Sequence, residues 1–184
     1  MELLFVNACM RAESRTERLA RMWLEQHEGP IEEVNLGSMS VAPLDCASIV
    51  TYGRAVSSAC YDDSMFDVAK QFANAKEILI AAPLWNFSLP SKLCNYLELV
   101  CTQGITFDVA ADGSYVSLCR ASRLTFVTTA GGIIRDRTDD HAFGLLQTLS
   151  RQFWHIPQVE RIAAEGLDAT GVDVDAALRA ALRQ

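Results

Sequence analysis

The sequence predicts a single α/β domain over residues 1–184, built on a doubly wound sheet of five parallel strands in the order 2-1-3-4-5. Three observations indicate this fold class. Short apolar runs of strand length alternate along the chain with stretches whose apolar residues recur at helical spacing. With 184 residues, 50% of them hydrophobic, the chain can bury one complete core. No internal repeat or low-complexity linker divides it.

Five segments are expected to form the strands of this sheet. The third begins with Glu77-Ile78-Leu79-Ile80, an apolar run short enough for a buried parallel strand. The second alternates apolar and polar residues, as a more exposed strand near the sheet edge does. The predicted strands are 3–7, 31–36, 77–82, 124–129 and 159–163.

Helices are expected between the strands, where apolar residues recur at helical spacing. The predicted helices are 14–28, 49–60, 64–73, 89–102, 142–153 and 174–182. The helix at 49–60 lies within a long polar segment, 37–64, which at that length is more often functional or locally helical than empty. The turn signal Asp112-Gly113 predicts a small hairpin or flap over 108–118, which we expect beside the site.

The stretch after the third strand carries the strongest functional signal. Leu84, Trp85, Asn86 and Phe87 form a bend between that strand and the next helix. Open parallel sheets bind their ligands at this carboxyl end of the strands. Such a bend can offer backbone N–H and C=O groups, an amide and aromatic surface to a flat heteroaromatic ring. The alternative is an ordinary loop whose aromatic side chains fill the top of the core.

A second candidate feature follows the first strand, where Ser14, Thr16 and Glu17 have the pattern of a capping box at a helix start. In that motif the serine oxygen accepts from the N–H three residues on, and the glutamate reaches back. The same geometry suits a phosphate, because the first N–H groups of a helix are free and hydroxyl groups lie beside them. Arg11 and Arg15 add positive charge nearby. The alternative is a helix start that binds nothing.

A third feature is the turn Ala130-Gly131-Gly132, which follows the fourth strand at Thr129. Two glycines allow the backbone to come close to a ligand, and a strained turn without a ligand is the alternative. In the predicted strand order all three features lie beside the switch point between strands one and three. A phosphate site, a site for a ring edge and a closely approaching backbone together fit flavin mononucleotide (FMN).

Composition and charge argue against several other functions. The chain has 23 acidic and 16 basic residues, a formal net charge of -7 and no basic run, so it lacks the electrostatic footprint of nucleic-acid binding. Its 6 cysteines and 3 histidines form no tight cluster, which indicates neither a disulfide framework nor a metal site. No stretch reaches the roughly 18 apolar residues of a membrane span, and no signal segment is evident. We therefore expect a cytoplasmic protein.

The order of motifs resembles that of a known family, the FMN-dependent NADH azoreductases and related NAD(P)H quinone oxidoreductases of flavodoxin-like fold. The segments that carry this resemblance are, in chain order, Ala82-Pro83-Leu84-Trp85-Asn86-Phe87, Lys92, Asn95-Tyr96 and Gly104-Ile105-Thr106-Phe107. A looser agreement extends over 7–16 and 128–132. The resemblance therefore covers most of the chain.

The resemblance implies a bound FMN and assigns residues to its parts. The implied contacts are Ser14, Arg15 and Thr16 for the phosphate, Leu84, Trp85, Asn86 and Phe87 for the isoalloxazine ring, and Thr129, Ala130, Gly131 and Gly132 for the ring edge. The flavin would carry the hydride chemistry, so no catalytic side chain and no metal are required. Backbone N–H groups around Asn86 would support the chemistry by stabilising charge on the ring.

The family also implies a homodimer that takes electrons from NADH or NADPH and delivers them to a quinone or an azo compound. Because donor and acceptor would share one flavin face, we expect two-electron ping-pong turnover. The sequence does not separate NADH from NADPH or identify the acceptor. Two other functions are weighed against this one: a one-electron carrier of flavodoxin type, and a flavin-free regulatory or interaction module of the same fold.

Two positions depart from the family pattern. Ala8-Cys9 stands where relatives often have a serine, and Asp108-Val109 stands where some have an aromatic residue. The first removes one flavin contact, and the second bears on the preferred acceptor. Cys9 lies near a helix start, where a thiolate is stabilised. We nevertheless expect a passive packing role for Cys9.

Overall fold

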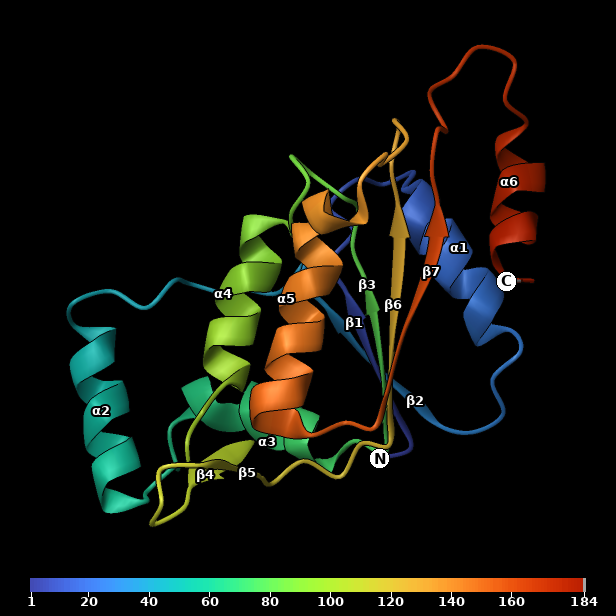
Figure 1. Cartoon of the computed structure of the whole chain (residues 1–184). Helices are drawn as coiled ribbons and strands as arrows, with labels where there is room; N and C mark the ends of the chain where they lie inside the picture. Colours follow the sequence, from blue (N-terminus) through green and yellow to red (C-terminus); the bar gives the residue numbers. More distant parts are fainter. Residues whose placement is uncertain (184) are drawn as a thin grey trace.

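A computed structural model describes residues 1–183 of the chain (Figure 1). Its centre is a five-stranded, all-parallel sheet in the spatial order β2-β1-β3-β6-β7. The strands are β1 (Leu3–Asn7), β2 (Ile31–Asn35), β3 (Glu77–Ala81), β6 (Arg123–Thr129) and β7 (Gln158–Ala164). Because β4 and β5 form a separate hairpin, β6 and β7 are the fourth and fifth strands of the sheet. The predicted order 2-1-3-4-5 is therefore confirmed.

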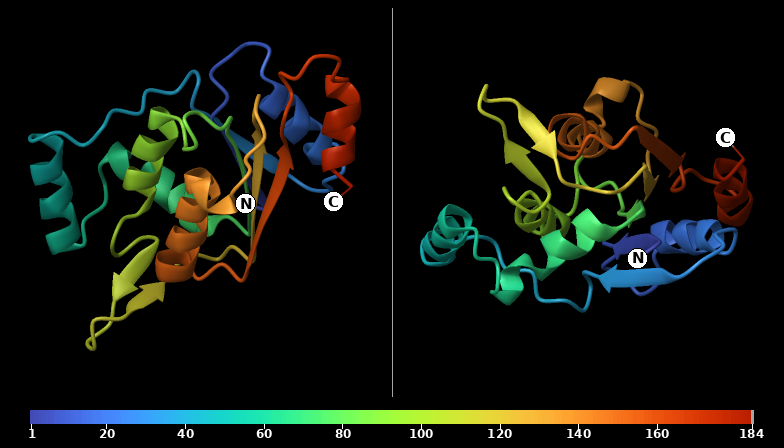
Figure 2. Two further views of the ribbon diagram at one scale, coloured as in Figure 1. Left: turned by 45° about the horizontal axis from the view of Figure 1, so that its top comes forward. Right: turned by 90° about the horizontal axis from the view of Figure 1, so that it is seen from below.

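Helices cover both faces of the sheet (Figures 1 and 2). One face carries α1 (Arg15–Leu24) and α6 (Val174–Ala181), and the other carries α3 (Asp67–Asn74), α4 (Ser91–Val100) and α5 (His141–Leu149). Side chains of β1 alternate between the two cores, with Leu3 and Phe5 beneath α1 and α6, and Leu4 and Val6 beneath the other three helices. Three short helical segments complete the structure: η1 (Ser64–Phe66), η2 (Arg137–Asp139) and the π-helical η3 (Ser150–Trp154).

The start of α1 differs in part from the predicted capping box. The Ser14 side chain accepts a hydrogen bond from the Glu17 N–H at 3.3 Å, as expected. The Glu17 carboxylate, however, does not reach back to Ser14. It accepts from the Asn7 amide and from the Arg21 guanidinium, each at 3.0 Å, and the bond from Arg21 is the stronger, charge-assisted kind. The second half of the predicted motif was therefore wrong.

Helix α2 (Ser48–Ser58) lies within the long polar segment, as predicted, but it stands apart from the sheet (Figure 1). None of its residues is buried, and Ile49 and Val50 are 47% and 50% exposed. Tyr52 ties it to the body: its hydroxyl donates to the Cys101 carbonyl at 3.3 Å, and its ring lies 5.8 Å from that of Phe66, between centroids. This helix therefore gains little of the tertiary packing that usually stabilises a helix.

The hairpin forms where predicted, from β4 (Phe107–Val109) and β5 (Tyr115–Ser117), but its expected place beside the site was wrong. It lies at the opposite end of the sheet, at the bottom of Figure 1, where Phe107 stacks on Phe153 at 4.3 Å between ring centroids. The reason is topological. Helix α4 runs back from the carboxyl ends of the strands, so the chain that follows it emerges at their amino ends.

Candidate functional site

The candidate site is a cavity of about 220 Å³ at the carboxyl ends of β1, β3 and β6. It gathers the three loops that were expected to meet, and a fourth loop, after β7, contributes Asp168. The predicted residues that line it are Ser14, Arg15, Thr16, Leu84, Trp85, Thr129 and Gly131. Asn86, Phe87, Ala130 and Gly132 belong to the same two turns but lie outside the lining. The lining is completed by Met10, Arg11, Glu13, Pro83 and Asp168.

The first turn of α1 presents unpaired donors to this cavity. Ser14 caps the helix by binding the N–H of Glu17. The backbone N–H groups of Arg15 and Thr16 have no protein acceptor among residues 1–183. Because they lie at a helix N-terminus, they carry partial positive charge and can bind an anion. The predicted phosphate site therefore has free donors in the backbone.

The Thr16 hydroxyl has a structural partner inside the protein. Thr16 is 1% exposed, and its Oγ1 shares a hydrogen bond of 2.7 Å with Oγ1 of Thr129. This bond joins the helix after β1 to the end of β6. It fixes two walls of the cavity relative to each other, since both side chains are buried.

Arg15 and Gly131 meet at a residue that the sequence analysis missed. The Arg15 guanidinium lies 2.7 Å from Asp168 Oδ1 and donates to the Leu167 carbonyl at 3.0 Å. A Cβ atom on Gly131 would overlap the Asp168 carboxylate. Gly131 thus makes room for Asp168, and whether its backbone also approaches a ligand stays a prediction. Neither Gly131 nor Gly132 has a positive φ.

The bend after β3 is a tight two-residue turn. Trp85 and Ser88 exchange two backbone hydrogen bonds, of 3.1 and 2.9 Å. Between them, Asn86 and Phe87 both have positive φ, at 50° and 61°. The Trp85 and Phe87 side chains are 38% and 54% exposed, so the aromatic surface faces outward and does not fill the core. The core-filling alternative is therefore excluded for this turn.

Further backbone donors remain free around these turns. The N–H groups of Asn86, Gly131 and Gly132 have no acceptor within the described residues 1–183. Free donors at the rim of a cavity can bind an electron-rich edge of a flat ligand, because an amide that finds no partner loses hydrogen-bonding energy. The rim therefore offers donors near aromatic surface.

The floor beside β1 is polar but fully bonded. Asn7 is 0% exposed, and its amide donates to Glu17 and Glu33 at 3.0 Å each while its oxygen accepts from the Cys9 N–H at 3.1 Å. Burial raises the pKa of the Cys9 thiol to about 11, so this thiol stays protonated at neutral pH. Its surroundings support the packing role predicted for Cys9.

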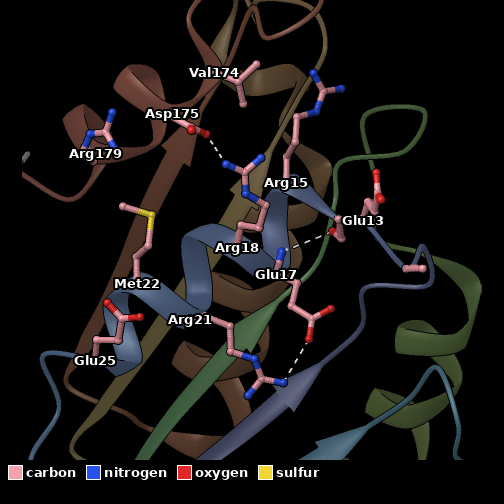
Figure 3. Close-up of a pocket in the computed structure, with 12 residues that line it drawn as sticks. Glu13, Arg15, Glu17, Arg18, Arg21, Met22, Glu25, Val174, Asp175 and Arg179 are labelled. Carbon is pink, nitrogen blue, oxygen red and sulfur yellow. Dashed lines mark hydrogen bonds and ion pairs between the residues drawn. The ribbon is translucent and has the colours of Figure 1, made fainter.

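A larger hollow, of about 870 Å³, lies between α1 and α6 (Figure 3). Its charges balance, since as many acidic as basic side chains line it. Arg18 pairs with Asp175, and Arg21 with Glu17 at 3.0 Å (Figure 3). The smaller cavity balances in the same way, with Arg11 and Arg15 against Glu13 and Asp168, so net charge does not separate the two hollows. We place the functional site at the smaller cavity, because three strand-end loops with free donors meet there.

No group of three His, Cys, Asp or Glu side chains within residues 1–183 is arranged to hold a metal ion. Over the same range, no helix has both the length and the apolar character needed to cross a bilayer.

The chain is similar in sequence to FMN-dependent NADH:quinone oxidoreductases. The FMN-dependent NADH:quinone oxidoreductase 2 of Clostridium perfringens (strain 13 / Type A) is 28% identical over 180 residues, covering 94% of this chain and 90% of that protein. The FMN-dependent NADH:quinone oxidoreductase of Shewanella sp. (strain W3-18-1) is 32% identical over 160 residues, covering 83% of this chain and 78% of that protein. These relatives confirm the family resemblance seen in the motifs.

Solved structures share the fold. The FMN-dependent NADH-azoreductase of Bacillus anthracis str. Ames Ancestor, in complex with FMN, superposes with a TM-score of 0.81 at 21% identity and covers 100% of this chain and 95% of that one. The azoreductase of Bacillus anthracis str. Sterne gives a TM-score of 0.82 at 17% identity, with the same coverage. Residues 1–184 match a family described as having a flavodoxin-like fold, and the chain belongs to this family, Flavodoxin_2.

Proposed function

We propose that this chain is an FMN-dependent NAD(P)H oxidoreductase of one domain that reduces quinones or azo compounds. The relatives named above are FMN-dependent NADH:quinone oxidoreductases, and a structure of the same fold is an FMN-dependent NADH-azoreductase. The observation that carries the proposal is the meeting of three strand-end loops at one cavity, with free N–H groups at a helix start and aromatic side chains on a tight turn.

The residues present fit FMN in its two parts. The backbone N–H groups of Arg15 and Thr16 would hold the phosphate, with Ser14 beside them. The cavity, at about 220 Å³, is smaller than the roughly 300–1,000 Å³ of pockets that enclose a whole ligand. We therefore assign the phosphate end to the cavity and the isoalloxazine ring to the surface of Leu84, Trp85, Asn86 and Phe87.

The remaining residues would orient the ring. Thr129, Ala130, Gly131 and Gly132 follow β6 beside the cavity, where the N–H groups of the two glycines are free to meet the ring edge. When bound, FMN supplies two-electron hydride chemistry between a nicotinamide and an acceptor. The backbone N–H groups near Asn86 and Gly131 would stabilise negative charge that develops on the ring.

The phosphate assignment is tested by replacing Ser14 and Thr16 together with Ala. We expect FMN binding to weaken by about 1–3 kcal/mol, because hydrogen bonds at a charged group are lost and the wall held by Thr16 loosens. Titration with FMN, followed by flavin fluorescence, measures the affinity. The double variant Ser122→Ala/Thr148→Ala, at exposed hydroxyls outside the site, is the control. Equal FMN affinity in both double variants would overturn the phosphate assignment.

The proposed turnover is ping-pong, because donor and acceptor share one open ring face. Initial rates with NADH and a benzoquinone should give parallel double-reciprocal lines. Lines that intersect would contradict a shared face. A protein that binds FMN but is not oxidised or reduced by this pair would favour the one-electron carrier, and a protein that binds no FMN would favour the flavin-free module.

We also propose a homodimer, and a location in the cytoplasm. Helix α2 has no buried residue, and the exposed Trp85 and Phe87 would leave a monomeric site open to water. Light scattering of the FMN-bound protein should give twice the chain mass of 20.3 kDa. A mass of one chain at micromolar concentration would contradict the dimer.

A further inference from the structure

The Asn86-Phe87 turn has a conformation that its own residues do not favour. A two-residue turn with positive φ at both central positions is a type I′ turn, in which the second position is usually glycine. Asn86 tolerates this region, whereas Phe87, with φ of 61°, carries a bulky side chain there and is strained. Such strain persists only where surrounding structure over-determines the conformation. A contact from outside the turn must therefore hold it.

That contact comes from the backbone of α5. The Phe87 carbonyl accepts a hydrogen bond of 3.1 Å from the N–H of His141, the first residue of the helix. First-turn N–H groups have no partner within their own helix, so this donor is available to the turn. The His141 side chain is exposed. The N–H of a helix start thus fixes the carbonyl of the strained residue.

The start of α5 is in turn anchored by buried charge. Asp140 caps the helix by accepting from the Phe143 N–H at 3.0 Å. Its other carboxylate oxygen lies 2.9 Å from Arg161 Nε on β7, an ion pair without the alignment of a hydrogen bond. The two side chains are 4% and 14% exposed. Little water screens this pair, so separating the two charges is costly.

Arg161 also connects the start of α5 to the loop after β6, through Glu165. Arg161 Nη2 lies 2.6 Å from Glu165 Oε1, which also lies 2.5 Å from Arg137 Nη1. The other oxygen of Glu165 accepts from the Ile134 N–H at 3.1 Å. Burial raises the pKa of Glu165, but hydrogen bonds from Arg161 and Arg137 outweigh it and hold this pKa below its ordinary value. The charged network therefore fixes both ends of the 133–141 loop.

We propose that the His141 N–H, held in place by the Asp140–Arg161 pair, positions the Phe87 turn against the bound ligand. Asp140 and Arg161 do not line the cavity, so both are positioning residues. The ligand named here, FMN, rests on the proposed function. The hydrogen bond from the His141 N–H to the Phe87 carbonyl is present in the chain without ligand, so its effect on the turn can be tested separately from FMN binding.

The test compares His141→Pro with His141→Ala. Proline is tolerated at the first helical position but has no N–H, whereas alanine keeps the N–H and loses the exposed ring. The preceding residue, Asp140, has a ψ of 74°, outside the helical region that a following proline disfavours. The two variants therefore differ at the donor to Phe87.

Within residues 85–88, the Trp85 and Ser88 amides are hydrogen-bonded across the turn, and we expect these two to exchange hydrogen faster in His141→Pro than in His141→Ala. Mass spectrometry of peptides from the full chain without ligand measures this exchange. We expect FMN to bind about three- to tenfold more weakly to the proline variant, as the loss of one hydrogen bond implies. The absorption band of bound FMN should also shift in that variant alone, which a merely less stable fold would not cause.

A second pair of variants tests the anchor. Asp140→Asn keeps a side-chain cap but removes the charge that faces Arg161. Asp173→Asn makes the same change at the exposed cap of α6, where Asp173 accepts from the Ala176 N–H at 3.0 Å. Only Asp140→Asn should accelerate exchange at 85–88 and shift the FMN band. This pair decides the question if His141→Pro fails to fold.

The outcomes separate the two proposals. Equal exchange at 85–88 in His141→Pro and His141→Ala would overturn the positioning role, whatever the protein binds. Faster exchange in His141→Pro, in a chain that binds no FMN, would support the positioning role and overturn the proposed function. Faster exchange with unchanged FMN affinity and spectrum would overturn the claim that the turn is positioned for this ligand.

Discussion

The turns after β3 and β6 lie beside the same cavity, yet they use glycine in opposite ways. After β6, Gly131 and Gly132 occupy conformations open to any residue, since neither has a positive φ. After β3, where the backbone does enter the left-handed region, the chain has Asn86 and Phe87. Glycine is thus present where conformation does not require it and missing where conformation favours it.

The difference shows that the two turns meet different demands. At Gly131 the demand is space, because the Asp168 carboxylate lies where a Cβ atom would be. At Phe87 an aromatic residue occupies a conformation that favours glycine, and its ring, 54% exposed, gains little packing in return. Under the proposed function, ligand binding and stability therefore oppose each other at the β3 turn and not at the β6 turn.

The largest effect should come from Phe87→Gly. Glycine adopts positive φ without strain, and little packing is lost because the Phe87 ring is 54% exposed. We expect a gain of about 1 kcal/mol in unfolding free energy, which raises Tm by about 2–4 °C for a chain of this size. Under the proposed function, FMN binding and turnover should fall together. Calorimetry and FMN titration on the same sample measure both changes, and a lower Tm would show that Phe87 is not strained.

Gly131→Ala should act in the opposite direction. The new methyl group would push Asp168 away and break its ion pair with Arg15, at a cost of about 1 kcal/mol. Because Asp168 is the obstacle, the double variant Gly131→Ala/Asp168→Ala should be no less stable than Asp168→Ala alone. Urea unfolding of the three variants measures this coupling. Additive losses would show that the obstacle lies elsewhere.

Asn86→Gly should have a smaller effect than Phe87→Gly. Asparagine adopts the left-handed region more readily than other non-glycine residues, so little strain is relieved. We expect a gain of a few tenths of a kcal/mol at most. A gain equal to that of Phe87→Gly, measured in the same urea series, would show that the turn as a whole is strained and not Phe87 in particular.

The smallest effect should come from Gly132→Ala. No atom lies within 4 Å of a Cβ placed on Gly132, and its φ is not positive. We expect a change within about 0.5 kcal/mol in either direction, as for an ordinary surface substitution. A larger loss at this position would mean that the two glycines of the β6 turn share one role.

Most of the fold could be predicted from the sequence because buried parallel strands leave a direct signal. Runs such as Ile78-Leu79-Ile80 are apolar throughout, and the chain between them repeats at helical spacing. The meeting of the three predicted loops at one site followed from the predicted strand order. The positive φ of Phe87 left no such signal, since the dipeptide Asn-Phe does not announce a type I′ turn as Asn-Gly does.

Asp168 could have been found by the reasoning that found Gly131. The strand order places β7 next to β6, so the loop after β7 must lie beside the loop after β6. The place of the hairpin at 107–117 could have followed from the direction of α4. The Asp140–Arg161 pair does not follow from the strand order in this way. Its partners are 21 positions apart in the sequence, and their meeting depends on how α5 packs beside β7.

The isolation of α2 has a consequence for labelling experiments. The two cysteines with exposed side chains, Cys46 and Cys60, stand just before and just after this helix. Burial raises the pKa of Cys101 and Cys119 to about 12, so these thiols react slowly with maleimides at neutral pH. A fluorescent maleimide added to the unaltered protein should therefore attach first at the two ends of α2. Its emission would report directly on whether this helix stands in water or lies against another surface.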